Sequence, residues 1–163
     1  MKTTLLLVGL FLSTFLQAQN VINGSFETNT APLGCTYNVS NAVYDGYISN
    51  SAGFGVYEAL DIIVNGCFVN NIPDGSYAVT VANNPTNNIE GEAVSLEIDA
   101  PLTIGNQYQI SFQATAVQYA SVIQGDLLIG VSTASNSFGD LVDTAVTVEN
   151  VWNSYTFTFI ATS

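Results

Sequence analysis

The side chains that could do chemistry in this chain are carboxylates, tyrosines and two cysteines. Lys2 is the single basic residue and histidine is absent, so residues 19–163 carry thirteen Asp and Glu and no cationic side chain. Nucleophile systems that pair Ser or Cys with His cannot be assembled, and zinc sites built on His or several Cys are excluded as well. A catalytic reaction would have to use two carboxylates, as glycoside hydrolysis does.

Three pairs of acidic residues lie close enough in the sequence to be considered for such a reaction. They are Glu90 with Glu92, Glu97 with Asp99, and Asp140 with Asp143. A catalytic pair needs burial and shifted pKa values, whereas Glu97 and Asp99 fall on the polar face of an alternating strand. We therefore interpret the three pairs as surface carboxylates and predict that the protein is not an enzyme. A carboxylate-dependent glycoside hydrolase or lyase is the alternative function.

Tyrosines are better candidates for a functional site. Tyr37, Tyr44, Tyr47 and Tyr57 gather in one irregular stretch that also holds Asp45 and several Asn residues. Sugars stack on aromatic rings, while amides and carboxylates hydrogen-bond their hydroxyl groups. We predict that Tyr44, Tyr47, Tyr57 and Asp45 bind a neutral oligosaccharide or polysaccharide. Support of the loop or core is the alternative for each tyrosine, and a structural spacer that binds nothing is a further alternative for the protein.

Charge and the N-terminal segment narrow the possible partners and the location. Residues 19–163 have a formal charge of −13, because no basic residue follows Lys2. Such a chain has no cation to replace the counterions of nucleic acid or to attract an anionic lipid surface. The apolar run 5–16 behind Lys2 is typical of a signal peptide over residues 1–18. We therefore predict a secreted or cell-surface protein without membrane insertion after signal removal, with one domain over 19–163.

Cys35 and Cys67 are the only cysteines, and both follow the predicted signal peptide. An oxidising compartment favours a disulfide between them. Two unpaired buried thiols are the alternative.

Alternation of apolar and polar residues predicts the elements that position these groups. The alternating stretches are 76–82, 93–98, 108–116, 126–132 and 154–161. Each is typical of a half-buried strand with one apolar face, and turn residues such as Gly, Asn and Pro separate them. Seven or eight short strands predict an all-β fold, a β-sandwich. Residues 28–60 are predicted to form long loops at one end of it.

Several stretches resemble one protein family. The run Asn23-Gly24-Ser25-Phe26-Glu27 resembles the opening strand of galactose-binding-like jelly rolls, especially carbohydrate-binding modules of the CenC type. Residues 100–116 resemble the middle signature of that family, and 126–161 resemble versions of the domain in large surface proteins of gliding bacteria. The resemblance implies a jelly-roll β-sandwich that binds glycans or mediates adhesion at a bacterial surface, alone or with further domains of a longer chain.

The resemblance also implies a structural Ca²⁺ at Ser25 and Glu27. In the family, a Glu and an oxygen two residues before it help to hold the ion that ties the first strand to the last, and calcium favours such hard oxygen ligands. The family's Asp from the closing strand has no counterpart here, because the sequence ends at Ser163. We therefore expect a jelly roll that lacks its final strand, with an open edge along 21–26 and weak calcium binding. A solvated Glu27 at a strand end is the alternative.

Overall fold

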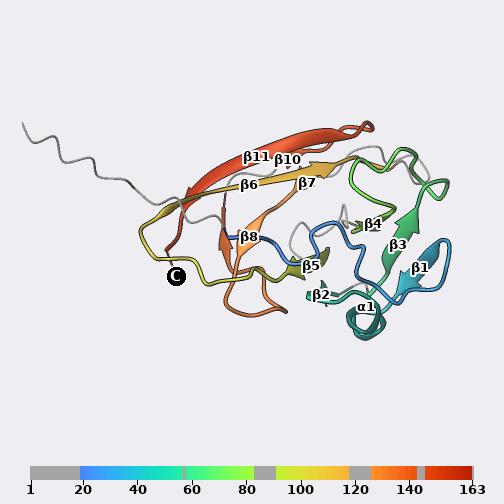
Figure 1. Cartoon of the computed structure of the whole chain (residues 1–163), viewed down its shortest axis with the longest axis horizontal. Helices are drawn as coiled ribbons and strands as arrows, with labels where there is room; N and C mark the ends of the chain where they lie inside the picture. Colours follow the sequence, from blue (N-terminus) through green and yellow to red (C-terminus); the bar gives the residue numbers. More distant parts are fainter. Residues whose placement is uncertain (1–18, 57, 83–90, 118–125, 143–145, 163) are drawn as a thin grey trace, which may run out of the picture.

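A computed structural model describes residues 19–56, 58–82, 91–117, 126–142 and 146–162. A long ribbon of two strands, β6 (Gln107–Ala114) and β11 (Asn153–Ile160), runs along the molecule (Figure 1). At one end of it gather β1 (Thr36–Val39), β3 (Leu60–Val64), β4 (Tyr77–Thr80) and α1 (Asn41–Tyr47). The predicted signal peptide, residues 1–18, lies outside the described residues.

The largest sheet holds the core. It has the order β1-β3-β4, with β1 (Thr36–Val39), β3 (Leu60–Val64) and β4 (Tyr77–Thr80) antiparallel to one another. Because β3 is central and nearly continuously apolar, Leu60, Ile62 and Ile63 are fully buried. Beside this sheet, β2 (Ser51–Gly55) pairs with β5 (Glu92–Leu96).

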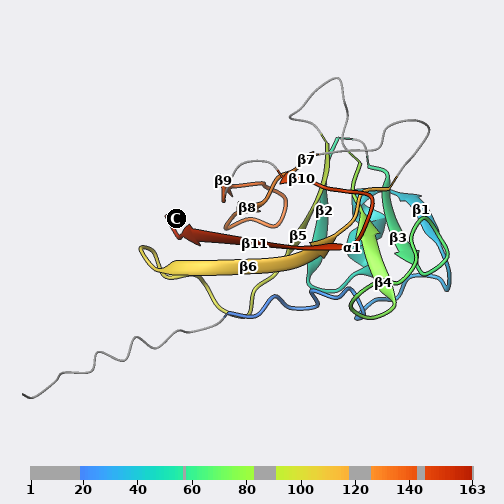
Figure 2. The ribbon, with the colours of Figure 1, turned by 90° about the horizontal axis from the view of Figure 1, so that it is seen from above.

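The ribbon consists of β6 (Gln107–Ala114) and β11 (Asn153–Ile160), which pair antiparallel over eight consecutive residue pairs. One face carries aromatic rings: Phe112 stacks on Tyr155 and Phe157, with ring centroids 5.7 and 5.8 Å apart. The other face is exposed and carries mostly Gln, Ser and Thr. This alternation confirms the strands predicted over 108–116 and 154–161. Seen from above, the ribbon runs along one side of the molecule (Figure 2).

The strand predicted over 126–132 is wrong in one respect, because it is divided between two small sheets. The first part, β7 (Asp126–Leu127), pairs with β10 (Val146–Thr147), and the second, β8 (Gly130–Val131), pairs with β9 (Asp140–Leu141). Gly130 explains the close approach of the second pair, because an added Cβ would overlap the carbonyl oxygen of Phe138.

The prediction of long loops over 28–60 is also wrong. This stretch contains β1, the helix α1 (Asn41–Tyr47) and β2. Ser40 caps the helix, since its side chain accepts a hydrogen bond from the Val43 backbone N–H. Only Tyr44 of the helix is buried, so the helix contributes no apolar stripe long enough to be recognised in the sequence.

The expected opening strand is reduced to a single bridge. Val21 bridges to Ile98, and the Ile22 backbone N–H donates to the Glu97 carbonyl at 2.7 Å. The chain then turns away, with Asn23 and Phe26 both at positive φ, so 21–26 does not form an extended open edge. The antiparallel sheets, together with a single short helix among the described residues, nevertheless confirm the predicted all-β class and are consistent with a β-sandwich.

Candidate functional site

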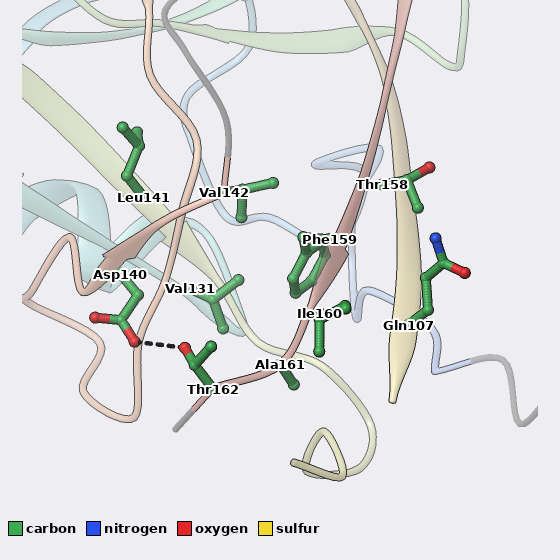
Figure 3. A pocket seen from close by; sticks show the side chains of 10 residues that line it. All are labelled: Gln107, Val131, Asp140, Leu141, Val142, Thr158, Phe159, Ile160, Ala161 and Thr162. Carbon is green, nitrogen blue, oxygen red and sulfur yellow. Dashed lines mark hydrogen bonds between the residues drawn. The ribbon is translucent and has the colours of Figure 1, made fainter. Parts of the chain in front are cut away.

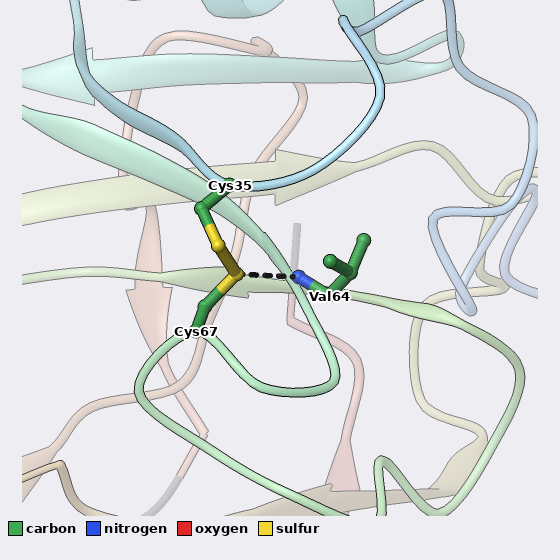
Figure 4. Close-up of a disulfide and its surroundings, with 3 residues drawn as sticks. All are labelled: Cys35, Val64 and Cys67. Carbon is green, nitrogen blue, oxygen red and sulfur yellow. Dashed lines mark hydrogen bonds between the residues drawn. A yellow bond between two sulfur atoms is a disulfide. The ribbon is translucent and has the colours of Figure 1, made fainter.

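The predicted disulfide is confirmed and anchors one surface of the molecule. Cys35 and Cys67 are bonded, with their Cα atoms 5.9 Å apart (Figure 4). Cys35 directly precedes β1, and Cys67 lies in the turn after β3, where its sulfur accepts the Val64 backbone N–H at 3.3 Å. The bond therefore fastens the turn after β3 to the start of β1.

Two aromatic rings lie beside this disulfide because each follows one of its cysteines closely in sequence. The rings of Tyr37 and Phe68 have centroids 4.9 Å apart and planes tilted by 45°. Their side chains are 43% and 42% exposed, and no other aromatic residue in the described ranges is exposed to this degree. We call Tyr37 and Phe68 the aromatic pair.

Two exposed asparagines lie close in sequence to the aromatic pair. Asn38 is exposed, and its backbone N–H donates to Asp61 Oδ1 at 2.8 Å. Asn70 is exposed too, and its carbonyl accepts a hydrogen bond from Trp152 Nε1 at 3.1 Å. The surface thus combines apolar rings with neutral hydrogen-bonding groups, which suits an uncharged ligand that has both hydroxyl groups and C–H faces.

Tyr44 does not belong to this surface, in contrast to its predicted role. Its side chain is 0% exposed and packs in the core, and its hydroxyl shares a hydrogen bond of 2.7 Å with Ser51. Burial raises the pKa of Tyr44 to about 12. The turn of α1 points this ring inward, so a sugar has no face of it on which to stack.

The other residues predicted to bind a sugar are not brought together. Tyr47 is half-buried against the core, and Asp45 accepts the Gly53 backbone N–H at 2.7 Å, which braces α1 against β2. Tyr57 lies outside the described residues. Sugar binding by Tyr47, Asp45 and Tyr57 stays a prediction.

Glu27 has a clear structural partner. Its Oε1 accepts the backbone N–H groups of Ser76 and Tyr77 at 2.7 and 2.8 Å, so it fastens the N-terminal segment to the start of β4. Ser25 is half-buried nearby in sequence. Within the described ranges, no three His, Cys, Asp or Glu side chains lie together as a possible metal-binding group. A structural Ca²⁺ at Ser25 and Glu27 stays a prediction.

We expect the replacement of Gly75 by alanine to lower the free energy of unfolding by about 1–2 kcal/mol more than the same change at Gly66. Both glycines have left-handed φ, +84° and +92°, but a Cβ at Gly75 would overlap the Glu27 carboxylate, whereas nothing lies within 4 Å of a Cβ at Gly66. Urea unfolding of the two variants measures the difference. Equal losses would show that the Glu27 hydrogen bonds contribute nothing. Repeating the comparison with calcium and with a chelator tests the predicted Ca²⁺ site.

A hollow of about 400 Å³ lies between β9 and the end of β11 (Figure 3). Phe159 and Leu141 are among its apolar lining residues, and Asp140 accepts a hydrogen bond of 2.9 Å from the Thr162 hydroxyl. Asp140 is the one charged residue among those that line it. A single carboxylate does not supply the pair that glycoside hydrolysis needs.

The remaining described members of the acidic pairs also have structural partners. Glu97 accepts the Asn50 amide at 2.9 Å. Asp99 accepts both the side-chain amide and the backbone N–H of Asn20, and these bonds lower its pKa. Glu92 is buried, and its carboxylate accepts two backbone N–H groups. Glu90 and Asp143 lie outside the described residues.

The chain matches no family model, no curated protein sequence and no solved structure at a significant level. Within the part of the chain that the structure describes, no helix has the length and apolar character needed to cross a membrane.

Proposed function

We propose that this protein is a secreted, non-catalytic module that binds neutral glycans at a bacterial surface. The observation that carries the proposal is the aromatic pair, whose members are the two exposed aromatic side chains of the described residues. The disulfide holds both rings in place before a ligand arrives, so little conformational entropy is lost on binding. The predicted signal peptide and the disulfide are both consistent with an oxidising, extracellular location.

The geometry and charge of this surface favour one class of glycan. Because the two rings are tilted by 45°, they form no single flat platform, and a soluble, bent chain suits them better than the flat face of a crystalline polymer. Because residues 19–163 lack cationic side chains, an acidic sugar would meet repulsion without compensation. Neutral oligosaccharides and soluble neutral polysaccharides are therefore the expected ligands, at millimolar to micromolar affinity, or about −4 to −8 kcal/mol.

The test replaces the aromatic pair. We expect Tyr37→Ala/Phe68→Ala to lose about tenfold or more of its affinity, or about 1.4 kcal/mol, for a neutral glycan that retains the parent protein. Each single change should cause part of that loss. A glycan array first identifies the ligand, and affinity electrophoresis on it then ranks the variants.

Ile104→Ala is a matched control, because Ile104 is also an exposed apolar residue and lies in the turn before β6. It should bind as the parent does. Unchanged retention of the double variant would overturn the assignment of the site to the aromatic pair. Failure of every neutral glycan to retain the parent at millimolar concentration would favour the spacer alternative.

A further inference from the structure

The ribbon of β6 and β11 is an unusual surface for so acidic a chain. Neither Gln107–Ala114 nor Asn153–Ile160 contains a charged residue, a proline or a glycine. Across the described residues the two strands pair with each other and with no third strand. Natural edge strands are usually protected from pairing with other chains by lysine, proline, a bulge or short length. The ribbon has none of these, since it is eight pairs long and regular in register.

The exposed face of the ribbon is also chemically suited to a copy of itself. Gln109, Ser111 and Gln113 of β6 lie opposite Thr158, Thr156 and Ser154 of β11, and all six side chains are exposed. Ser111 and Thr156 already share a hydrogen bond of 3.0 Å. Amide and hydroxyl side chains can continue such hydrogen bonding across a strand pair formed by two identical strands.

The lack of charged residues within the two strands allows a second copy to approach along the ribbon. Two copies that each carry a formal charge of −13 over residues 19–163 repel each other over most of their surfaces. Two carboxylates lie at the ends of the ribbon: Glu149 accepts the Asn153 amide at one end, and Asp140 accepts the Thr162 hydroxyl and lines the hollow beside Ile160 at the other. Along the ribbon itself, two copies can approach without placing like charges opposite each other.

We propose that the outer edge of β6, the edge away from β11, pairs with the same edge of a second copy of this chain. The pairing joins the two ribbons into a continuous four-stranded sheet. The arrangement is symmetric, since each copy contributes the same strand. Electrostatic repulsion opposes it, so the association strengthens when salt screens the carboxylates. The proposal does not depend on glycan binding.

Sedimentation velocity of the exported protein at about 0.01 M and about 1 M NaCl tests this inference. We expect monomers at low salt and dimers at high salt. Gln109→Glu/Gln113→Glu adds two carboxylates to the ribbon of each copy at almost unchanged shape, and should weaken association by about tenfold or more. Asn71→Asp/Asn136→Asp adds the same charge at exposed positions off the ribbon and should associate as the parent does.

Amide hydrogen exchange locates the interface. On association, outward-facing amides of β6 should gain protection, while amides of the distant β1 strand should not. A parent protein that stays monomeric at high salt would overturn the proposal, and so would a ribbon variant that associates as strongly as the control. Near-ultraviolet circular dichroism shows whether each variant keeps the parent fold. The proposal would also be overturned if the protein associates but only amides outside β6 gain protection.

Discussion

Replacing Cys35 and Cys67 together with serine should lower the free energy of unfolding by about 3–4 kcal/mol. The two cysteines are separated by 32 positions in sequence, so the disulfide restricts a long loop in the unfolded chain. The loop contains β1, α1, β2 and β3, which together supply much of the core. Urea unfolding of the double variant and of the oxidised parent measures the loss. A change below about 1 kcal/mol would contradict the prediction.

The same double variant should also lose glycan retention, because the disulfide positions the aromatic pair. Tyr37 lies in β1, which pairs with β3, and Phe68 follows Cys67 in the turn after β3. The bond between the preceding cysteines adds a covalent link to this strand pairing and holds the two rings together. Tyr37→Ala/Phe68→Ala is the matched comparison. It should lose retention with a much smaller change in stability, since both side chains are exposed. Full retention by the cysteine variant at a temperature where it is folded would show that the pair is held by other contacts.

The sequence predicted the ribbon well and the region around α1 poorly, for a physical reason. Strand geometry sends successive side chains to opposite faces, so the alternation predicts that Tyr108, Ile110 and Phe112 share one face, and they do. The helix α1 has seven residues, and it is held by its Ser40 cap and one buried tyrosine. Such a short helix depends on its tertiary contacts more than on its own periodicity.

Neither ring of the aromatic pair is among the residues that the sequence analysis predicts to bind a sugar, although the sequence carries a signal for their proximity. The disulfide was predicted correctly, and it already implied that Phe68, next to Cys67, would approach Tyr37, two residues after Cys35. The prediction that Tyr44 binds a sugar requires an exposed ring, but Tyr44 is buried. A cluster of tyrosines in the sequence does not show which rings face the core. That direction depends on the helix, whose turn carries Tyr44 to the core and Asp45 to the surface.

Glu92 combines burial, hydrogen bonding and charge in a way that makes stability depend on pH. Its side chain is 8% exposed. One carboxylate oxygen accepts the Ala59 backbone N–H at 2.6 Å, and the other accepts that of Ala82 at 2.7 Å. Glu92 begins β5, so these two bonds join β5 to the residue before β3 and to the chain after β4. Burial raises the pKa of Glu92 above its ordinary value of 4.5, and the negative charge of Asp61 adds to the rise, although the two N–H donors oppose it.

Glu92→Ala should therefore lower the free energy of unfolding by about 2–6 kcal/mol, because two buried N–H groups each lose their acceptor at about 1–3 kcal/mol. Glu92→Gln should lower the free energy of unfolding by less than Glu92→Ala does, since the glutamine carbonyl oxygen can still accept one of the two bonds.

The pH dependence of stability separates the effect of the Glu92 charge from that of its shape. A pKa that is higher in the folded state means that the folded state binds the proton more tightly. The resulting stabilisation is complete below the unfolded pKa, near 4.5, and is lost as pH rises through the folded pKa. Unfolding curves from pH 4 upward should therefore show the advantage of the parent over Glu92→Gln shrinking as pH rises, since the glutamine does not titrate. An advantage that is constant or grows over this range would mean that burial does not control this carboxylate.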